Sequence, residues 1–487
     1  MAFRHGVYKQ EVPTSLLSPV QTEAGLPVIV GTAPIHLASG EGALSNVNKP
    51  QLIYNYDEAV SMFGFSDDWE KYTLCEFIYS QFALFAVFPC MLINVLDPEK
   101  HKETVAPASF TITNGQANLG QNVILAKGIT FEGETTYTAG ADYSLGYDES
   151  GNEILTVIKG EKLATVSTVK AGFTRIKPEN VTAYDIIGGI DANTDAKTGF
   201  ELVNSVFPKF RMIPGLLGSP KWSGNPEVAA VMRAKAENIN GVFTAMSMVD
   251  IPSDSGGADK YSEAPEWKNQ HNYTGIHEIV CWPKVKLGDR VFHLSTQLIG
   301  AMNTTDTGND DTPYVSPSNK PLQIDACVTD DGIEVDLGLE TANYLNGQGI
   351  VTALNWTGGW RAWGNRTGAH PDNTDVKDKF ISVRRMFDWI GNEFVRTMWQ
   401  NVDADMSLRL IRAVLNSYNI RLDGLSARGY ILGGRIEFKS TENPATDLLD
   451  GIMRFHIYFS PAIPAEQIVG ILEYDPGYLA QLFSTAA

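Results

Sequence analysis

Apolar residues recur at two different periods along this chain, and the alternation between them predicts a mixed α/β fold. Residues 28–31 (VIVG) and 90–98 (CMLINVLDP) are short apolar runs typical of buried strands. Between them, residues 74–85 (LCEFIYSQFALF) space their apolar side chains as a helix does. Strand, helix and strand in this order predict a β-α-β unit.

The same alternation returns near residue 199. Two helices and two strands are predicted, in the order helix, strand, helix, strand, over residues 199–207, 210–217, 225–239 and 241–250. In the second of these helices, Asn225 can cap the N-terminus and Pro226 suits the first turn. Strands that alternate with helices at this spacing predict a mainly parallel sheet covered by helices.

Residues 103–180 have a different texture. They are rich in Thr, Val, Gly and Asn, and every gap between strand-like runs holds turn residues. No tryptophan occurs between Trp69 and Trp222. We interpret this segment as an inserted β-rich domain.

The last part of the chain predicts a compact α+β domain. Residues 378–400 repeat apolar side chains at steps of three or four, at Phe380, Val383, Phe387, Ile390, Phe394 and Met398. A second helix is predicted over residues 405–420, through Met406, Leu410, Val414 and Tyr418. Three strand-like runs separated by turn residues follow, at residues 429–438, 451–460 and 466–475.

Residues 4–12 (RHGVYKQEV) read as a strand with no local partner. The polar, proline-containing stretch behind them, residues 13–27, is too long for a two-residue hairpin loop. An unpaired strand exposes backbone N–H and C=O groups. We therefore expect this segment to pair far along its own chain or with another molecule.

The net charge of the chain argues against a nucleic-acid partner. The chain has 487 residues and a formal net charge of −19, from 38 basic and 57 acidic residues, so it repels phosphate backbones.

Two kinds of single residue carry further expectations. Arg384 and Arg385 are expected to form ion pairs at a contact surface. The cysteines show no CxxC spacing and are predicted to be buried thiols, at positions 75, 90, 281 and 327.

No signal peptide or membrane span is expected. The N-terminus lacks an apolar segment, and the most apolar stretch, residues 82–96, is short and interrupted by Pro89 and Asn94. There is also no GxxxxGK[ST] phosphate loop.

The sequence gives only weak signals for catalytic or metal-binding sites. Residues 253–259 (SDSGGAD) are similar to the nucleophile segment of trypsin-like proteases, but a nucleophilic serine also needs a positioned histidine and an oxyanion site. His271 and His277 have no carboxylate or cysteine cluster that completes a zinc set. The Asp-rich residues 304–313 lack EF-hand spacing. No catalytic, cofactor-binding or metal-binding residue is therefore assigned.

Three tryptophans are close together in the sequence, Trp356, Trp360 and Trp363. They could form a sugar-binding platform. Burial beneath the C-terminal helix is the more common fate of such residues, and we expect it here.

Four motifs in order resemble those of contractile tail sheath proteins from myophages and phage-tail-like particles. They are GVYKQEVP at 6–13, SPSNKPL at 316–322, WGNRT at 363–367, and residues 443–474 with their N-P turn, D-G step, P-x-x-P-A-E link and final strand. WGNRT and the helix after it take the form seen in P2-like and Mu-like phages. SPSNKPL departs from the family's A-P-A-N-x-x-L wording. The resemblance covers nearly the whole chain and is weakest in residues 103–180.

The resemblance implies an α/β core with a subtilisin-like sheath domain, an inserted β-domain, a C-terminal α+β domain, and extended N- and C-terminal arms. The expected segments are an N-terminal arm and linker (1–20), the α/β core (21–102 plus 181–370), the inserted β-rich domain (103–180), the C-terminal assembly domain (371–465) and the C-terminal arm (466–487).

In this family both arms leave their own subunit and add strands to the C-terminal sheet of neighbours. The resemblance places the N-terminal arm strand at Gly6, Val7, Tyr8, Gln10, Glu11 and Val12. It places the C-terminal arm strand at Gln467, Ile468, Val469, Ile471, Leu472 and Tyr474. The receiving assembly-domain strands carry Ile436, Phe438, Phe455, Ile457 and Phe459. Residues 13–27 and 460–466 are expected to be flexible joints.

The implied function is that of a structural sheath subunit. It polymerises around a tail tube in an extended metastable state and contracts to drive the tube through the target cell envelope. The implied partners are other copies of the chain in a helical or hexameric-ring sleeve, the tail tube protein, and baseplate and tail terminator proteins, without direct nucleic-acid contact or membrane insertion. No enzyme activity and no cofactor are expected. The implied location is the virion tail or a phage-tail-like particle, assembled in the bacterial host cytoplasm. An α/β hydrolase-like enzyme with an accessory β-domain is the alternative.

Overall fold

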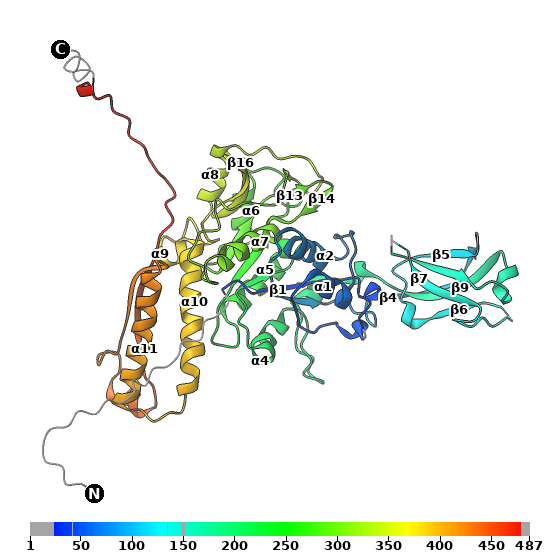
Figure 1. Cartoon of the computed structure of the whole chain (residues 1–487), viewed down its shortest axis with the longest axis horizontal. Coiled ribbons are helices and arrows are strands. Elements are labelled where there is room, and N and C mark those ends of the chain that lie inside the picture. The colour runs from blue at the N-terminus through cyan, green and yellow to red at the C-terminus, as the bar shows by residue number, and fades with distance from the viewer. Residues whose placement is uncertain (1–23, 41, 134, 149–150, 479–487) are drawn as a thin grey trace, which may run out of the picture.

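The computed structural model describes residues 24–40, 42–133, 135–148 and 151–478. Figure 1 shows an elongated molecule, with an α/β body in the middle, a β-rich lobe at one end and two long helices at the other. The predicted N-terminal strand, with Gly6, Val7, Tyr8, Gln10, Glu11 and Val12, lies outside the described residues. It stays a prediction.

An eight-stranded sheet forms the centre of the body, in the order β17-β16-β12-β11-β10-β1-β3-β2. The strands from β16 to β3 run parallel, and β17 and β2 are antiparallel edges. Their bounds are β1 (Pro27–Gly31), β2 (Gln51–Ile53), β3 (Cys90–Asn94), β10 (Leu216–Gly218), β11 (Met246–Asp250), β12 (Glu278–Cys281), β16 (Ile350–Trp356) and β17 (Gly359–Trp363). The prediction of a mainly parallel sheet is confirmed.

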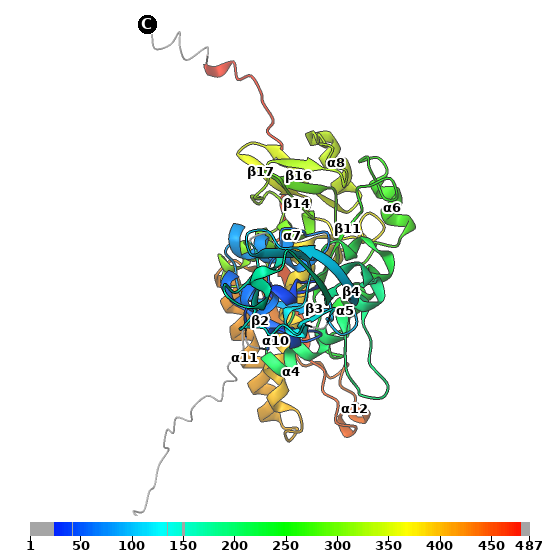
Figure 2. The same ribbon diagram turned by 90° about the vertical axis from the view of Figure 1, so that its right-hand side faces the viewer.

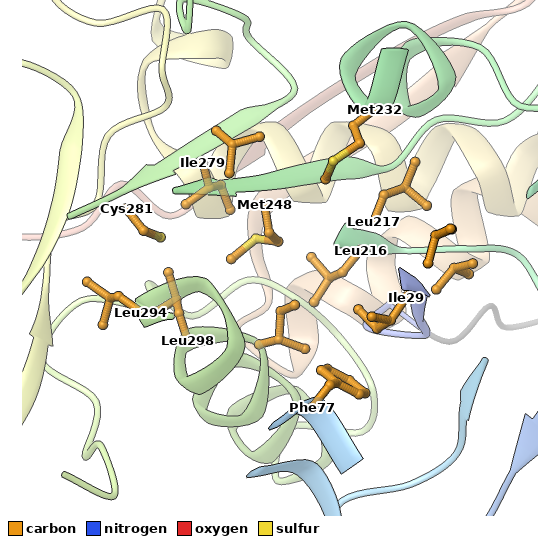
Figure 3. Close-up of a cluster of buried hydrophobic side chains, with 14 of the residues drawn as sticks. Ile29, Phe77, Leu216, Leu217, Met232, Met248, Ile279, Cys281, Leu294 and Leu298 are labelled. Carbon is orange, nitrogen blue, oxygen red and sulfur yellow. The ribbon is translucent and has the colours of Figure 1, made fainter. Parts of the chain in front are cut away.

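Helices cover both faces of this sheet. Figure 3 shows Leu298 of α7 and Phe77 of α2 on one side of the strands and Met232 of α5 on the other. Successive residues of a strand point to opposite faces of the sheet, so Leu216 and Leu217 pack toward the helices on opposite faces. Both side chains are fully buried. The helices of the body are α1 (Tyr56–Phe63), α2 (Thr73–Ile78), α3 (Ala183–Ile187), α4 (Val206–Phe210), α5 (Pro226–Glu237), α6 (Ala264–Gln270), α7 (Leu294–Thr307) and α8 (Leu339–Gly347).

Local signals placed α5 correctly, whereas strand ends were misplaced. The Asn225 side chain accepts a hydrogen bond from the Glu227 N–H at 2.9 Å, and Pro226 opens the helix, as predicted. The strand predicted from residue 210 begins only at Leu216, because α4 continues to Phe210. A small antiparallel sheet also flanks the body, built from β13 (Lys284–Leu287), β14 (Arg290–Phe292) and β15 (Ala326–Val328).

The prediction for the tryptophan cluster is wrong. Trp356, Trp360 and Trp363 lie on the β16–β17 hairpin at one edge of the large sheet, and not beneath the C-terminal helix. Trp356 is 59% exposed. The Trp363 indole N–H donates to Asn343 Oδ1 at 2.8 Å. An edge hairpin leaves part of its surface to solvent, which the sequence spacing does not reveal.

Residues 102–176 form the β-rich lobe, drawn in cyan in Figure 1. Two three-stranded antiparallel sheets, β4-β9-β6 and β5-β8-β7, enclose a separate core that includes Leu119, Leu155 and Phe173. The strands are β4 (Lys102–Thr111), β5 (Gln116–Gln121), β6 (Ile129–Phe131), β7 (Tyr143–Tyr147), β8 (Asn152–Val157) and β9 (Thr168–Ile176). The first and last strands pair with each other, from Lys102 opposite Ile176 onward, so the chain enters and leaves the lobe at one place.

Glu153 on β8 makes the stability of this lobe sensitive to pH. Its side chain is fully buried, and neither carboxylate oxygen has a hydrogen-bond partner among the described residues. Burial disfavours the charged form and raises the pKa of Glu153 from 4.5 to about 8. Below pH 4.5 both the folded and the unfolded chain hold this proton. As the pH rises from 4.5 to about 8, the unfolded chain releases the proton while the folded protein keeps it, so the free energy of unfolding falls over this range.

We expect Glu153→Gln to raise the melting temperature of the lobe at pH 9 and to leave it nearly unchanged at pH 4, because glutamine keeps the shape without the ionisation. Thermal unfolding of both proteins at the two pH values measures the difference. Equal stabilisation at both pH values would contradict this account of Glu153.

Two long helices and a two-stranded sheet make up the C-terminal part. The elements are α9 (Val376–Lys379), α10 (Ile381–Met398), α11 (Leu408–Ala427), β18 (Ile431–Glu437), α12 (Ala445–Leu449) and β19 (His456–Pro461). Both predicted helices are confirmed, but the Ser407 side chain caps α11 through the Leu410 N–H, so Met406 precedes the helix. The third predicted strand run, residues 466–475, is not a strand in the isolated subunit.

Helix α10 joins this part to the body because it is buried on two sides. Its apolar side chains, among them Trp389 and Ile390, pack with Tyr418 of α11. On the other side, Arg385 pairs with Asp306 of α7. Arg384 pairs with Asp378 on α9 and with Asp388 on α10, and Asp388 Oδ1 in turn accepts from Thr244 Oγ1 of the body at 2.9 Å. The predicted ion pairs of the two arginines are therefore confirmed.

Two further expectations concern the cysteines and membrane-spanning helices. All four cysteines are free and buried, as predicted. Among the described residues, no helix combines the length and the apolar character that crossing a bilayer requires.

Candidate assembly interface

The β18–β19 hairpin packs against α11 and presents the predicted receiving residues. Ile436 is buried and pairs with Ile457, while the Phe459 ring lies 4.3 Å from that of Phe387 on α10. Phe438 and Phe455 lie just beyond the strand ends, with their rings 5.5 Å apart. The structure thus brings all five residues together around one small sheet.

One edge of this sheet is partly closed by a side chain. The Asn419 amide of α11 donates to the Ile436 carbonyl at 3.4 Å and accepts from the Ile436 N–H at 3.0 Å. These are the two backbone groups that an added strand would use. Asn419 therefore imitates a neighbouring strand along the outer edge of β18, and sequence analysis had no signal for it.

The outer edge of β19 is unpaired within the described part of the chain, where β18 is its sole strand partner. Residues of an antiparallel pair alternate between bonding each other and pointing their backbone groups outward. Because Ile436 points away from β19, its partner Ile457 also points outward, and so does Phe459 two residues on. These two residues offer N–H and C=O groups to a further strand.

The C-terminal arm leaves the subunit without covering its own apolar side chains. After Glu466 the chain runs away from the body (Figures 1 and 2), and residues 467–475 have no secondary structure. Ile468 and Ile471 are each 89% exposed and Leu472 is 98% exposed. Gln467, Val469 and Tyr474 are exposed as well. A row of exposed apolar residues of this length indicates an interaction segment.

The WGNRT motif has a structural role that its wording does not reveal. Gly364 has φ +147°, and a Cβ there would lie 2.8 Å from Val351 Cα, so only glycine fits. Asn365 O accepts from the Ile381 N–H at 2.9 Å, and Thr367 Oγ1 donates to Asp378 O at 2.6 Å. The loop is thereby fastened to the start of α10. Arg366 between them reaches Glu466 at the root of the C-terminal arm.

The weak enzymatic candidates do not come together. Ser255, the serine at the nucleophile position of residues 253–259, is exposed, His271 stacks on Trp267 with 4.2 Å between ring centroids, and His277 Nε2 lies 3.0 Å from Asp388 Oδ1. In the described ranges, no group of three or more His, Cys, Asp or Glu side chains is arranged to hold a metal ion.

A cavity of about 410 Å³ lies beside Asp250, at the carboxyl end of β11. Sequence analysis did not single it out, although open parallel sheets commonly bind ligands at that edge. Its charged groups already have protein partners: Asp250 binds Ser295, Lys284 pairs with Asp330, and His293 pairs with Glu76. Most of the charged groups that line the cavity are therefore engaged by other protein groups.

Similarity to a known protein extends over nearly the whole chain. No family model matches it. The tail sheath protein of Burkholderia phage BcepMu is 28% identical over 507 residues, covering 99% of this chain and 98% of that protein. The major tail sheath protein of Serratia phage KSP20 is 24% identical over 62% of this chain and 73% of its own length. The tail sheath protein of Escherichia phage P2 is 26% identical over 30% of this chain and 35% of its own.

Solved structures agree in fold. The sheath of an extracellular contractile injection system, PVC, in its contracted state superposes with a TM-score of 0.59 at 13% identity, covering 98% of this chain and 99% of that one. A chain of the anti-feeding prophage (AFP) baseplate gives a TM-score of 0.56 at 15% identity, over 98% and 100% of the two chains. The hydrolase alternative finds no support among these proteins. This chain is a homologue of the tail sheath proteins of Mu-like and P2 phages.

Proposed function

We propose that this protein is the structural, non-enzymatic subunit of a contractile tail sheath. It polymerises around a tail tube in an extended metastable state and contracts to drive the tube through the target cell envelope. The observation that carries the proposal is the similarity to the BcepMu sheath protein over 99% of this chain. The α/β body would then correspond to the subtilisin-like sheath domain, residues 102–176 to an insertion, and residues 371–465 to the assembly domain.

Subunits join by exchange of strands. Residues 467–474 of one subunit add to the outer edge of β19 of another, where Ile457 and Phe459 offer backbone groups. Eight residues in extended form span roughly 26 Å at about 3.3 Å each. Each backbone hydrogen bond contributes about 1 kcal/mol net, so one arm is a modest tether and repetition holds the polymer. The N-terminal arm, Gly6 to Val12, is proposed to act in the same way.

Contraction follows from energy stored at assembly, without a nucleotide. A bias of about 1.4 kcal/mol per subunit is only tenfold for one molecule, but it multiplies over a cooperative array. The tube, baseplate and terminator proteins are the proposed partners. The proposed location is the tail of a virion or a phage-tail-like particle assembled in the host cytoplasm, without a signal peptide.

Negative-stain electron microscopy of the purified protein tests the proposal. We expect striated hollow sleeves to form as the protein concentration rises, because each subunit carries both a donated arm and a receiving edge. Dispersed monomers with peptidase activity would overturn the proposal in favour of the hydrolase alternative.

A further inference from the structure

We propose that Arg366 and Glu466 form a clamp that sets the point and direction in which the C-terminal arm leaves its subunit toward a second copy of this chain. We call this ion pair the arm clamp. The inference rests on the proposed sheath function, because it concerns how the donated strand is presented.

The clamp has the geometry of a strong ion pair. Arg366 Nε donates to Glu466 Oε1 at 2.8 Å, and Arg366 Nη2 donates to Glu466 Oε2, so the contact is bidentate. The Arg366 side chain is 11% exposed and that of Glu466 is 32% exposed. The guanidinium also lies over the Phe380 ring, 4.4 Å from its centroid. Protein groups therefore hold the arginine on more than one side.

Arg366 is fixed before the arm reaches it. Its backbone bridges that of Phe380, and its neighbours Asn365 and Thr367 are hydrogen-bonded to Ile381 and Asp378. The arginine thus belongs to the rigid junction of the body and α10. Glu466, in contrast, comes from a segment without secondary structure. The glutamate is the member that the pair immobilises.

Exposure along the chain changes at this point. Pro461 closes β19 and is buried, and Glu466 is held by Arg366, so residues 462–465 form a strap fastened at both ends. Beyond Glu466, Ile468, Ile471 and Leu472 are almost fully exposed. The sequence predicts a flexible joint at residues 460–466. The clamp instead moves the pivot of the arm beyond Glu466, because an anchored side chain restricts the backbone that carries it.

A fixed root makes strand donation easier. Ordering a flexible segment on binding costs conformational entropy, and holding part of it in place beforehand reduces that cost. Hydrogen bonds to charged groups contribute more than neutral ones, so loss of the clamp is expected to raise the protein concentration at which sleeves form by about tenfold.

The test uses charge reversal in the full-length chain. The variants are Glu466→Arg, Arg366→Glu and the double exchange, with Glu466→Gln as the mildest change because Glu466 lies on the more exposed side of the pair. Lys260→Glu, in an exposed ion pair with Glu263 on the body, is the matched control. Circular dichroism confirms that each variant is folded.

Two readouts separate the clamp from the sheath function. A nitroxide label on Ala465→Cys, read by electron paramagnetic resonance in the dilute monomer, should become more mobile in the single variants and return toward the wild-type mobility in the double exchange. The four native cysteines are buried, so the label is selective for this position. Sedimentation should show the assembly threshold following the same order, with Lys260→Glu unchanged. Single variants with wild-type label mobility, or with higher mobility but an unchanged threshold, would overturn the clamp. Failure of the wild-type protein to form sleeves would overturn the sheath function, while the label mobility would still report on the ion pair.

Discussion

Deletion of residues 467–487 is expected to yield a folded subunit that no longer forms sleeves. The described part of this segment, residues 467–478, contributes no strand to its own subunit, and its apolar side chains are exposed. The core of the body and the α10–α11 cluster contain none of these residues. Sleeve formation is therefore expected to be abolished while the melting temperature stays near that of the full chain, as measured by electron microscopy and thermal unfolding.

A substitution pair provides the control for this deletion. Ile471→Pro removes a backbone N–H from the donated strand, whereas Ile471→Val keeps a residue that favours strands. The proline variant should assemble poorly and the valine variant normally, with equal monomer stability. Deletion of residues 1–14 is expected to have the same effect as loss of the C-terminal arm. Normal sleeves from either truncated chain would refute the assignment of that arm.

Asp306→Ala is expected to destabilise the junction between the body and α10 by about 3–5 kcal/mol in the free energy of unfolding. Asp306 on α7 and Arg385 on α10 are each 3% exposed, with Arg385 Nη1 3.2 Å from Asp306 Oδ1 and a second contact through Nη2. Removing the carboxylate leaves a buried guanidinium without its charge partner. Denaturant unfolding followed by tryptophan fluorescence measures the loss, since Trp389 lies on the same helix.

The double variant Asp306→Leu with Arg385→Met is the informative control. Replacing a buried ion pair with apolar residues of similar size is often neutral, so the double variant should regain most of the lost stability. Lys260→Ala, in an exposed pair with Glu263, should change the free energy of unfolding by less than about 1 kcal/mol. A loss below about 1 kcal/mol for Asp306→Ala would show that Arg385 is not confined as its burial indicates.

Comparison of the predicted elements with the structure shows where local patterns suffice. The cap predicts the helix that begins at Pro226, and the apolar runs at residues 28–31 and 90–98 predict the strands β1 and β3, although β3 ends at Asn94. The predicted boundaries of strands are less accurate, as at residue 210, where a strand is predicted that begins only at Leu216. A strand extends only as far as its backbone pairs with a neighbouring strand, and this pairing does not depend on local sequence. Residues 466–475 form no strand in the isolated subunit, and a strand donated to a neighbouring subunit stays a prediction there.

By itself, the sequence determined the periodicity of each segment, the mainly parallel sheet and the resemblance to sheath proteins, because these depend on residues close together in the chain or on motifs in order. Only the tertiary structure decided that the tryptophan hairpin lies at an edge, that Asn419 occupies one edge of the small sheet, and that Arg366 holds Glu466. The members of the last pair are 100 residues apart. Which distant groups meet depends on the packing of all the elements between them, and no local pattern encodes it.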